Sequence, residues 1–169
     1  MRVVGVDPGL TRCGLAAVDG GPGRRATLLG VTVARTSPED SLAARLCALE
    51  RELERFIAEH RPDEVAVEAV FSQHNSRTVI ATAQASGVAM LVGGRRGLPV
   101  DTHTPTEVKA GVTGNGRADK AQVARMVTSI LGLAGPPTPV DATDALALSL
   151  AHLWQAPVRA RRRVAGALR

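Results

Sequence analysis

The chain has 169 residues, of which 44% are hydrophobic and 22% are charged. This length and composition predict one globular domain with a buried core, and they exclude a disordered protein. The longest apolar stretch, residues 88–92, is far shorter than the roughly 20 residues that a membrane-spanning helix needs. We also recognise no signal peptide, so we expect a cytoplasmic protein without membrane contact.

Cysteine and histidine usage points away from zinc and disulfide chemistry. Cys13 and Cys47 are too few for either, and we expect each to be a small buried apolar residue. Histidines without metal-ligand spacing are usually surface or hydrogen-bonded core residues, which is our expectation for His60, His74, His103 and His152.

Positive charge is concentrated at the C-terminus. Residues 157–169 hold five arginines, which equal the formal net charge of +5, so the rest of the chain is neutral. We predict a folded domain over residues 1–156 and a basic, flexible tail over 157–169. Such a tail binds nucleic acid phosphates in many proteins, and it also serves elsewhere only to keep a protein soluble.

The first half of the chain reads as a meander followed by a long helix. Short strands are predicted over residues 2–7, 13–18 and 27–34, because apolar runs there are separated by glycine-rich turns. Leucines then recur at helical spacing over residues 37–60, which predicts an amphipathic helix ending before Pro62.

The second half alternates helices and strands. We predict strands over residues 65–70 and 98–102, and an alanine-rich helix over 76–92 between them. Further helices are predicted over residues 106–112, 118–131 and 141–154. Three antiparallel strands followed by alternating helices and strands indicate an α/β fold, with a mixed five-stranded sheet covered by helices on both faces.

Four acidic residues occupy prominent positions in this pattern. Asp7 ends the first strand, Glu68 follows the apolar residues 65–67, and Asp141 and Asp144 share one face of the last helix. Carboxylates beside apolar segments are costly to ionise unless a positive group joins them. The four acids are therefore a candidate cage for two divalent cations.

Most of these acids also have a purely structural interpretation. Aspartate before Pro-Gly is common in turns, as at Asp7. Asp141 and Asp144 have the spacing of a helix N-cap and its N3 partner. Glu68 is hardest to explain in this way, because its neighbours are apolar and no arginine or lysine lies nearby in the sequence.

In this order, the acids and their flanking motifs resemble the RuvC Holliday-junction resolvases, which belong to the ribonuclease H-like superfamily. The matching stretches run in family order over nearly the whole chain, at residues 7–9, 67–71, 84–88, 108–120 and 141–147. The chain departs from many relatives at Ala69, after the glutamate, and at Arg12-Cys13-Gly14, before the second strand. Neither departure changes a predicted metal ligand.

The resemblance implies a bacterial, homodimeric endonuclease that cuts two opposed strands of a four-way DNA junction during recombination and repair. Such an enzyme leaves 5′-phosphate and 3′-hydroxyl ends and uses two Mg²⁺ ions in each site, with Mn²⁺ as a substitute. A pair of ions can clamp the attacking water and the leaving oxygen of an in-line displacement. The implied catalytic residues and metal ligands are Asp7, Glu68, Asp141 and Asp144. A branch-migration motor of the RuvA and RuvB type is the implied partner.

The resemblance also assigns DNA contacts. It places Lys109 and Lys120, the only lysines of the chain, on phosphates near the scissile bond, and it places Phe71 against an unpaired base. Further phosphate contacts are expected from Asn75, Arg77 and Arg117. The structural alternatives are a solvated helix surface for the lysines and a core position for Phe71.

A homodimer also follows from symmetry, because a four-way junction has an approximate two-fold axis and resolution needs two cuts. The small residues of 80–87 are a candidate interface, although burial inside one monomer produces the same pattern.

Three other interpretations compete with this one. A different ribonuclease H-like nuclease, acting on RNA in a hybrid or on flaps, would use the same acids. A junction-binding module without catalysis would not need all four of them. An actin-like or sugar-kinase fold also begins with Asp-x-Gly, but it requires a second phosphate loop and about twice the length.

Overall fold

The computed structural model describes residues 1–70 and 76–167, apart from the side chains of 76, 77 and 157–167. Its sheet has the strand order β3-β2-β1-β4-β5. Both pairs on the β3 side are antiparallel and both pairs on the β5 side are parallel, as the sequence predicted for a mixed sheet. The strands are β1 (Arg2–Asp7), β2 (Arg12–Gly20), β3 (Ala26–Arg35), β4 (Glu64–Glu68) and β5 (Val100–His103).

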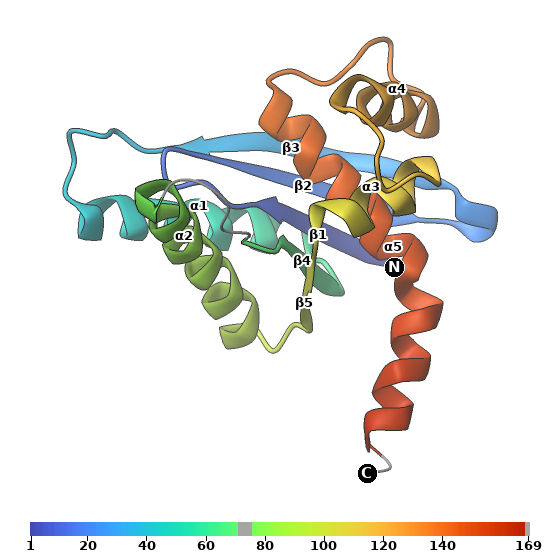
Figure 1. Ribbon diagram of the computed structural model, residues 1–169. Helices are drawn as coiled ribbons and strands as arrows, with labels where there is room; N and C mark the ends of the chain where they lie inside the picture. The colour runs from blue at the N-terminus through green and yellow to red at the C-terminus, as the bar shows by residue number, and fades with distance from the viewer. Residues whose placement is uncertain (71–75, 168–169) are drawn as a thin grey trace.

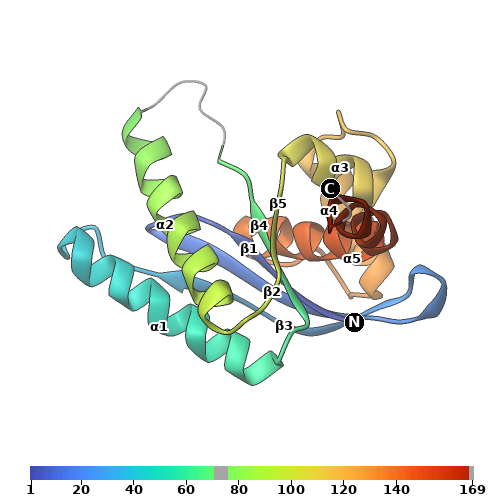
Figure 2. The same ribbon diagram turned by 90° about the horizontal axis from the view of Figure 1, so that it is seen from below.

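Helices cover both faces of this sheet (Figures 1 and 2). Helices α1 and α2 pack on one face, and α3, α4 and α5 pack on the other. A short 3₁₀ helix, η1 (Pro22–Arg24), lies in the turn between β2 and β3. The helices are α1 (Leu42–His60), α2 (Ser76–Arg95), α3 (Pro105–Thr113), α4 (Lys120–Leu131) and α5 (Val140–Ala167).

The central strands are apolar because both of their faces are buried. Val3 and Ala66 point toward α3, α4 and α5, whereas Val4 and Val65 point toward α1 and α2. Side chains alternate across a strand, so a strand between two helical layers needs apolar residues at nearly every position. The carboxylates that end β1 and β4 are exceptions to this rule.

Local capping explains where the first helix starts. It begins at Leu42 rather than at residue 37, because Ser41 Oγ accepts the backbone N–H of Ala44 at 3.3 Å and so acts as the N-cap. At the other end, Arg61 adopts a left-handed conformation, and its N–H donates to the carbonyl of Ile57.

The last helix is longer than predicted. The sequence analysis ended it at Trp154, but α5 continues to Ala167 and passes through Pro157. Proline removes one backbone donor, while the alanines and arginines of residues 159–167 favour helix strongly, which explains the continuation. This last part of α5 projects beyond the sheet (Figure 1).

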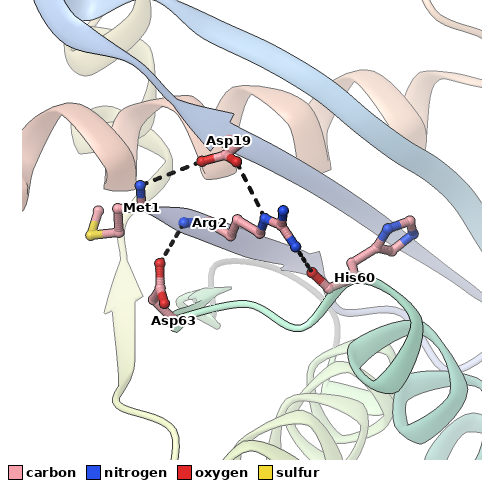
Figure 3. Close-up of polar contacts among 5 residues, drawn as sticks. All are labelled: Met1, Arg2, Asp19, His60 and Asp63. Carbon is pink, nitrogen blue, oxygen red and sulfur yellow. Dashed lines mark hydrogen bonds and ion pairs between the residues drawn. The ribbon is translucent and has the colours of Figure 1, made fainter.

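Polar contacts fix the start of β1 at the edge opposite the acids (Figure 3). The N–H of Arg2 donates to Asp63 Oδ2 at 2.7 Å, and its Nε donates to Asp19 Oδ2 at 3.2 Å. The Arg2 guanidinium also reaches the carbonyl of His60 at 3.5 Å. These contacts join β1 to the end of β2 and to the segment between α1 and β4.

The two cysteines differ in environment. Cys13 is buried as expected, and burial raises the pKa of its thiol to about 12. Cys47 is exposed, which corrects the expectation, because it lies on the side of α1 opposite the buried residues Leu49 and Leu53. In the described part of the chain, no helix is long and apolar enough to cross a membrane.

Candidate active site

Strand pairing brings the first two acids together. β1 and β4 are parallel neighbours in which Val6 pairs with Val67, so the next residues, Asp7 and Glu68, end adjacent strands at the same edge. Glu68 lies close enough to Asp7 for its charge to raise the pKa of the Asp7 carboxyl. Neighbouring carboxylates oppose each other's ionisation, so a proton or a cation is favourable between them.

Close packing of α5 brings the other two acids to the same edge. A Cβ atom on Gly5 would lie 2.6 Å from the carbonyl oxygen of Ala145, and one on Gly14 would overlap the carbonyl group of Asp141. Glycine at these positions lets the first turns of α5 lie directly on β1 and β2. That approach places Asp141 and Asp144 near enough to Asp7 to raise its pKa.

Electrostatics at this edge oppose full ionisation. Burial, followed by the charges of Glu68 and Asp144, raises the pKa of Asp7 from 3.8 to about 8. Burial also raises the pKa of Glu68, although the nearby lysines act in the opposite direction. The pair therefore retains a proton at neutral pH unless a cation takes its place.

Each helix acid lies beside a basic side chain. Lys120 Nζ donates to Asp144 Oδ2 at 3.1 Å, and this bond raises the pKa of Lys120. Arg12 forms an ion pair with Asp141, with 2.5 Å between its guanidinium nitrogen and Asp141 Oδ2. Among the described residues, none donates a hydrogen bond to this buried oxygen.

Two of the four acids and both lysines border a cavity of about 250 Å³. Glu68, Lys109, Lys120 and Asp144 supply its charged lining. The N-cap of α4, Asp119, accepts the N–H of Gln122 at 2.7 Å and thereby fixes the helix start that carries Lys120. Anionic and cationic groups thus face one space, which suits a phosphate and a bridging cation together.

The donor set fits a hard divalent cation. Carboxylate oxygens are the ligands that Mg²⁺ prefers, and Asp7, Glu68, Asp141 and Asp144 supply only such oxygens. The raised pKa of Asp7 shows that positive charge would be favourable beside it. Asp141 and Asp144 each pair with a basic side chain, Arg12 and Lys120 respectively.

The structure describes only some of the remaining predicted DNA contacts. Arg117 is exposed in the loop between α3 and α4, and its N–H donates to Asn115 Oδ1 at 3.0 Å. Phe71 and Asn75 lie outside the described residues. The backbone of Arg77 belongs to α2, but its side chain is also outside the description.

The sequence analysis did not find a second polar group, on the same face of β4 and β5. Glu64, Asp101 and His152 place one potential ligand atom each within 4.8 Å of one another. Among the described residues it is the one group of three or more potential ligands within this distance, which no three of the four acids meet. Asp101 and His103 alternate along β5 and so share a face, which is the sequence signal that could have revealed it.

Comparison with known proteins connects this geometry to one family. Residues 3–152 match the family described as "Crossover junction endodeoxyribonuclease RuvC". A protein of that description from Salinispora arenicola is 61% identical over 161 residues, which cover 95% of this chain and 92% of the relative. Another from Streptomyces avermitilis is 60% identical over 168 residues, covering 99% and 96% of the two chains.

Solved structures agree with these relatives. A structure described as Thermus thermophilus RuvC in complex with Holliday junction substrate has a TM-score of 0.89 and 34% identity, covering 94% of this chain and 96% of that one. The yeast mitochondrial Holliday junction resolvase Ydc2 has a TM-score of 0.64 at 11% identity, and so it shares the fold.

Proposed function

The chain belongs to the RuvC family of crossover junction endodeoxyribonucleases, and we propose that it resolves Holliday junctions at the edge of the sheet where Asp7, Glu68, Asp141 and Asp144 converge. It is a hydrolase that acts on DNA, as its relatives are. The observation that carries the proposed site is the parallel pairing of β1 with β4, which puts Asp7 and Glu68 on adjacent strand ends, with Asp144 near enough to raise the pKa of Asp7 and bonded to Lys120.

Two Mg²⁺ ions are the proposed cofactors, with Mn²⁺ as a substitute. When bound, they would supply the charge that activates a water and stabilises the leaving oxygen of the phosphodiester. Asp7 is the proposed bridging ligand, since it lies against Glu68 and within the electrostatic reach of both helix acids. Glu68 and Asp144 flank it, and Asp141 either binds a cation or orients the attacking water.

The lysines are proposed to hold the scissile phosphate. Lys109 and Lys120 lie on the cavity wall beside Glu68. The compact ammonium group of lysine binds a phosphate as a point charge, without the bidentate hydrogen bonding of an arginine guanidinium. When a cation binds to the acids, Lys120 would release its hydrogen bond to Asp144 and contact the DNA phosphate instead. Phe71, Asn75, Arg77 and Arg117 are the proposed contacts farther along the DNA.

A homodimer is the proposed working state. Apolar side chains are exposed along α2, at Ile80, Met90 and Leu91, and a second copy of this helix would bury them. Two copies related by a two-fold axis would present one acid site to each of two opposed strands. A motor of the RuvA and RuvB type is the further proposed partner.

The basic segment 157–169 is proposed as a DNA-binding arm of the domain formed by residues 1–156, in a bacterial cytoplasmic protein. Four of its arginines, at 159 and 161–163, belong to the final turns of α5, which extend past the sheet, and Arg169 lies outside the described residues. Deleting residues 158–169 should weaken junction affinity at moderate salt more than the cutting rate of bound junction.

Cleavage of a mobile synthetic junction tests the substrate. The protein with Mg²⁺ should place symmetric nicks in two opposed strands, and it should leave linear duplex and RNA–DNA hybrid intact. EDTA and the Asp7→Asn substitution should each abolish the nicks. Preferential cutting of the hybrid would favour another ribonuclease H-like activity, and tight binding without cutting would favour a junction-binding module.

A further inference from the structure

A hydrogen-bonded network of three polar side chains, Glu64, His152 and His103, runs between the sheet and α5, beginning at the edge opposite the acids. Glu64 Oε2 lies 2.8 Å from His152 Nε2, and His152 Nδ1 lies 2.7 Å from His103 Nε2. His152 is fully buried and His103 is 4% exposed. The two imidazole rings meet edge to face at 5.0 Å between centroids.

The hydrogen bonds of this network all run in one donor-to-acceptor direction when both histidines are neutral. When neutral His152 donates from Nε2 to the Glu64 carboxylate, its Nδ1 must accept from Nε2 of His103. Buried polar groups are costly without partners, so displacement of any one element would leave a neighbouring group unsatisfied. Hydrogen bonds depend more strongly on distance and angle than apolar contacts do. This network therefore specifies one relative position of β4, β5 and α5.

The same elements carry the charged groups of the acid site. Glu64 and Glu68 begin and end β4 on the same face, and Glu68 pairs in register with His103. The N–H of Ala69, directly after Glu68, donates to the carbonyl of His103 at 2.8 Å. On α5, His152 follows Asp144 by about two turns.

His103 also lies at the start of the lysine-bearing helix. The next residue, Thr104, is the N-cap of α3, with Thr104 Oγ1 accepting the N–H of Glu107 at 3.1 Å. Lys109 lies in the second turn of that helix and lines the cavity with Glu68. A shift of His103 would therefore move both the end of β4 and the origin of α3.

We infer that Glu64, His103 and His152 are positioning residues, which set the separation of Glu68 and Asp144 and the placement of Lys109. This inference rests on the proposed function, because it assigns these three residues a role in positioning the proposed metal ligands. Loss of a group that orients a metal ligand without binding the metal itself lowers metal affinity or activity by about 10- to 100-fold.

The test measures Mg²⁺ dependence in leucine variants at the two histidines. For His103→Leu and His152→Leu, we expect the half-saturating Mg²⁺ concentration in single-turnover junction cleavage to rise at least about 10-fold. Junction affinity measured in EDTA should change less than about two-fold, because Lys109 is one of several proposed phosphate contacts and the others are unchanged. In His103→Gln, an amide donor replaces the imidazole donor, and this variant should recover part of the Mg²⁺ affinity.

Ser149→Ala is the matched control for stability. Ser149 is fully buried on α5 and donates to the carbonyls of Ala16 and Ala145 at 3.1 and 2.9 Å, away from β4 and β5. It should lower the melting temperature without changing Mg²⁺ dependence. The inference is overturned if the folded leucine variants keep the wild-type Mg²⁺ dependence, or if Ser149→Ala shifts it equally. Failure of the wild-type protein to cut the junction would instead reject the proposed function.

Discussion

At the scale of single residues, the acid site is defined by the cost of placing carboxylates together. Asp7 and Glu68 end adjacent strands, and burial and neighbouring charge raise the pKa of Asp7 to about 8. A folded state that binds a proton more tightly than the unfolded state loses stability as the pH rises between the two pKa values. The metal-free protein should therefore lose stability between about pH 4 and pH 8 through this residue.

The Asp7→Asn substitution removes this loss. In EDTA at pH 8, we expect the variant to exceed the wild type in free energy of unfolding by about 1 to 3 kcal/mol. The difference should narrow toward pH 5, where the wild-type carboxyl is protonated. Urea denaturation followed by circular dichroism measures this quantity. Equal free energies of unfolding of the two proteins at pH 8 would show that ionisation of Asp7 does not destabilise the folded protein.

Lys120 offers a second test at this scale. The Lys120→Gln substitution should reduce single-turnover junction cleavage by about 10-fold or more, because it removes a charge-assisted contact to the scissile phosphate. Arg125→Gln is the control, since Arg125 is exposed on the same helix and lies outside the cavity lining. Equal loss in the two variants would indicate a general charge effect rather than a specific contact.

At the scale of elements, glycine sets how closely α5 approaches the sheet. A side chain on Gly14 would collide with backbone atoms of Asp141, which cannot move independently of the helix. The acid site therefore depends on a residue that carries no chemical group of its own.

Gly14→Ala should lower the free energy of unfolding by about 1 to 3 kcal/mol and reduce cleavage. Gly94→Ala is the matched control, because a Cβ there meets no atom within 4 Å. The control should be neutral or slightly stabilising, as alanine favours helix over glycine. Thermal unfolding and the junction assay on both variants measure the contrast, and a harmless Gly14→Ala would refute the close-packing argument.

Local patterns predicted the elements well where the sequence holds the whole cause. The strand of Arg2–Asp7 was predicted with its observed bounds, because its apolar run ends at Asp7-Pro8. The end of α5 was predicted too early, at Trp154 rather than at Ala167, because residues 157–169 were assigned to a flexible tail. The contacts of Arg12 with Asp141 and of His103 with His152 join residues far apart in the sequence, so only the folded packing reveals them.

At the scale of the whole molecule, paired cutting requires two sites in one assembly. The exposed apolar residues of α2 are the proposed contact between copies. Leu91→Asp should convert a dimer to monomer by placing a charge in that contact, and it should replace paired cuts by single nicks.

Analytical ultracentrifugation at micromolar concentration checks the assembly. Met126→Asp serves as the control, because Met126 lies on α4 rather than on α2. Its exposed fraction, 39%, is similar to the 49% of Leu91. A wild-type protein that sediments only as a monomer would contradict the proposed dimer. Loss of the dimer in both variants would mean that α2 is not the specific interface.

The central claim is that the acids at the ends of β1, β4 and the start of α5 hold the catalytic cations. Anomalous diffraction from crystals grown with Mn²⁺ tests it most directly, because it locates each ion among its ligands. We predict anomalous peaks between Asp7 and Glu68, with Asp144 or Asp141 completing the coordination. Peaks confined to Glu64, Asp101 and His152, or a complete absence of peaks at the four acids under saturating Mn²⁺, would contradict the claim.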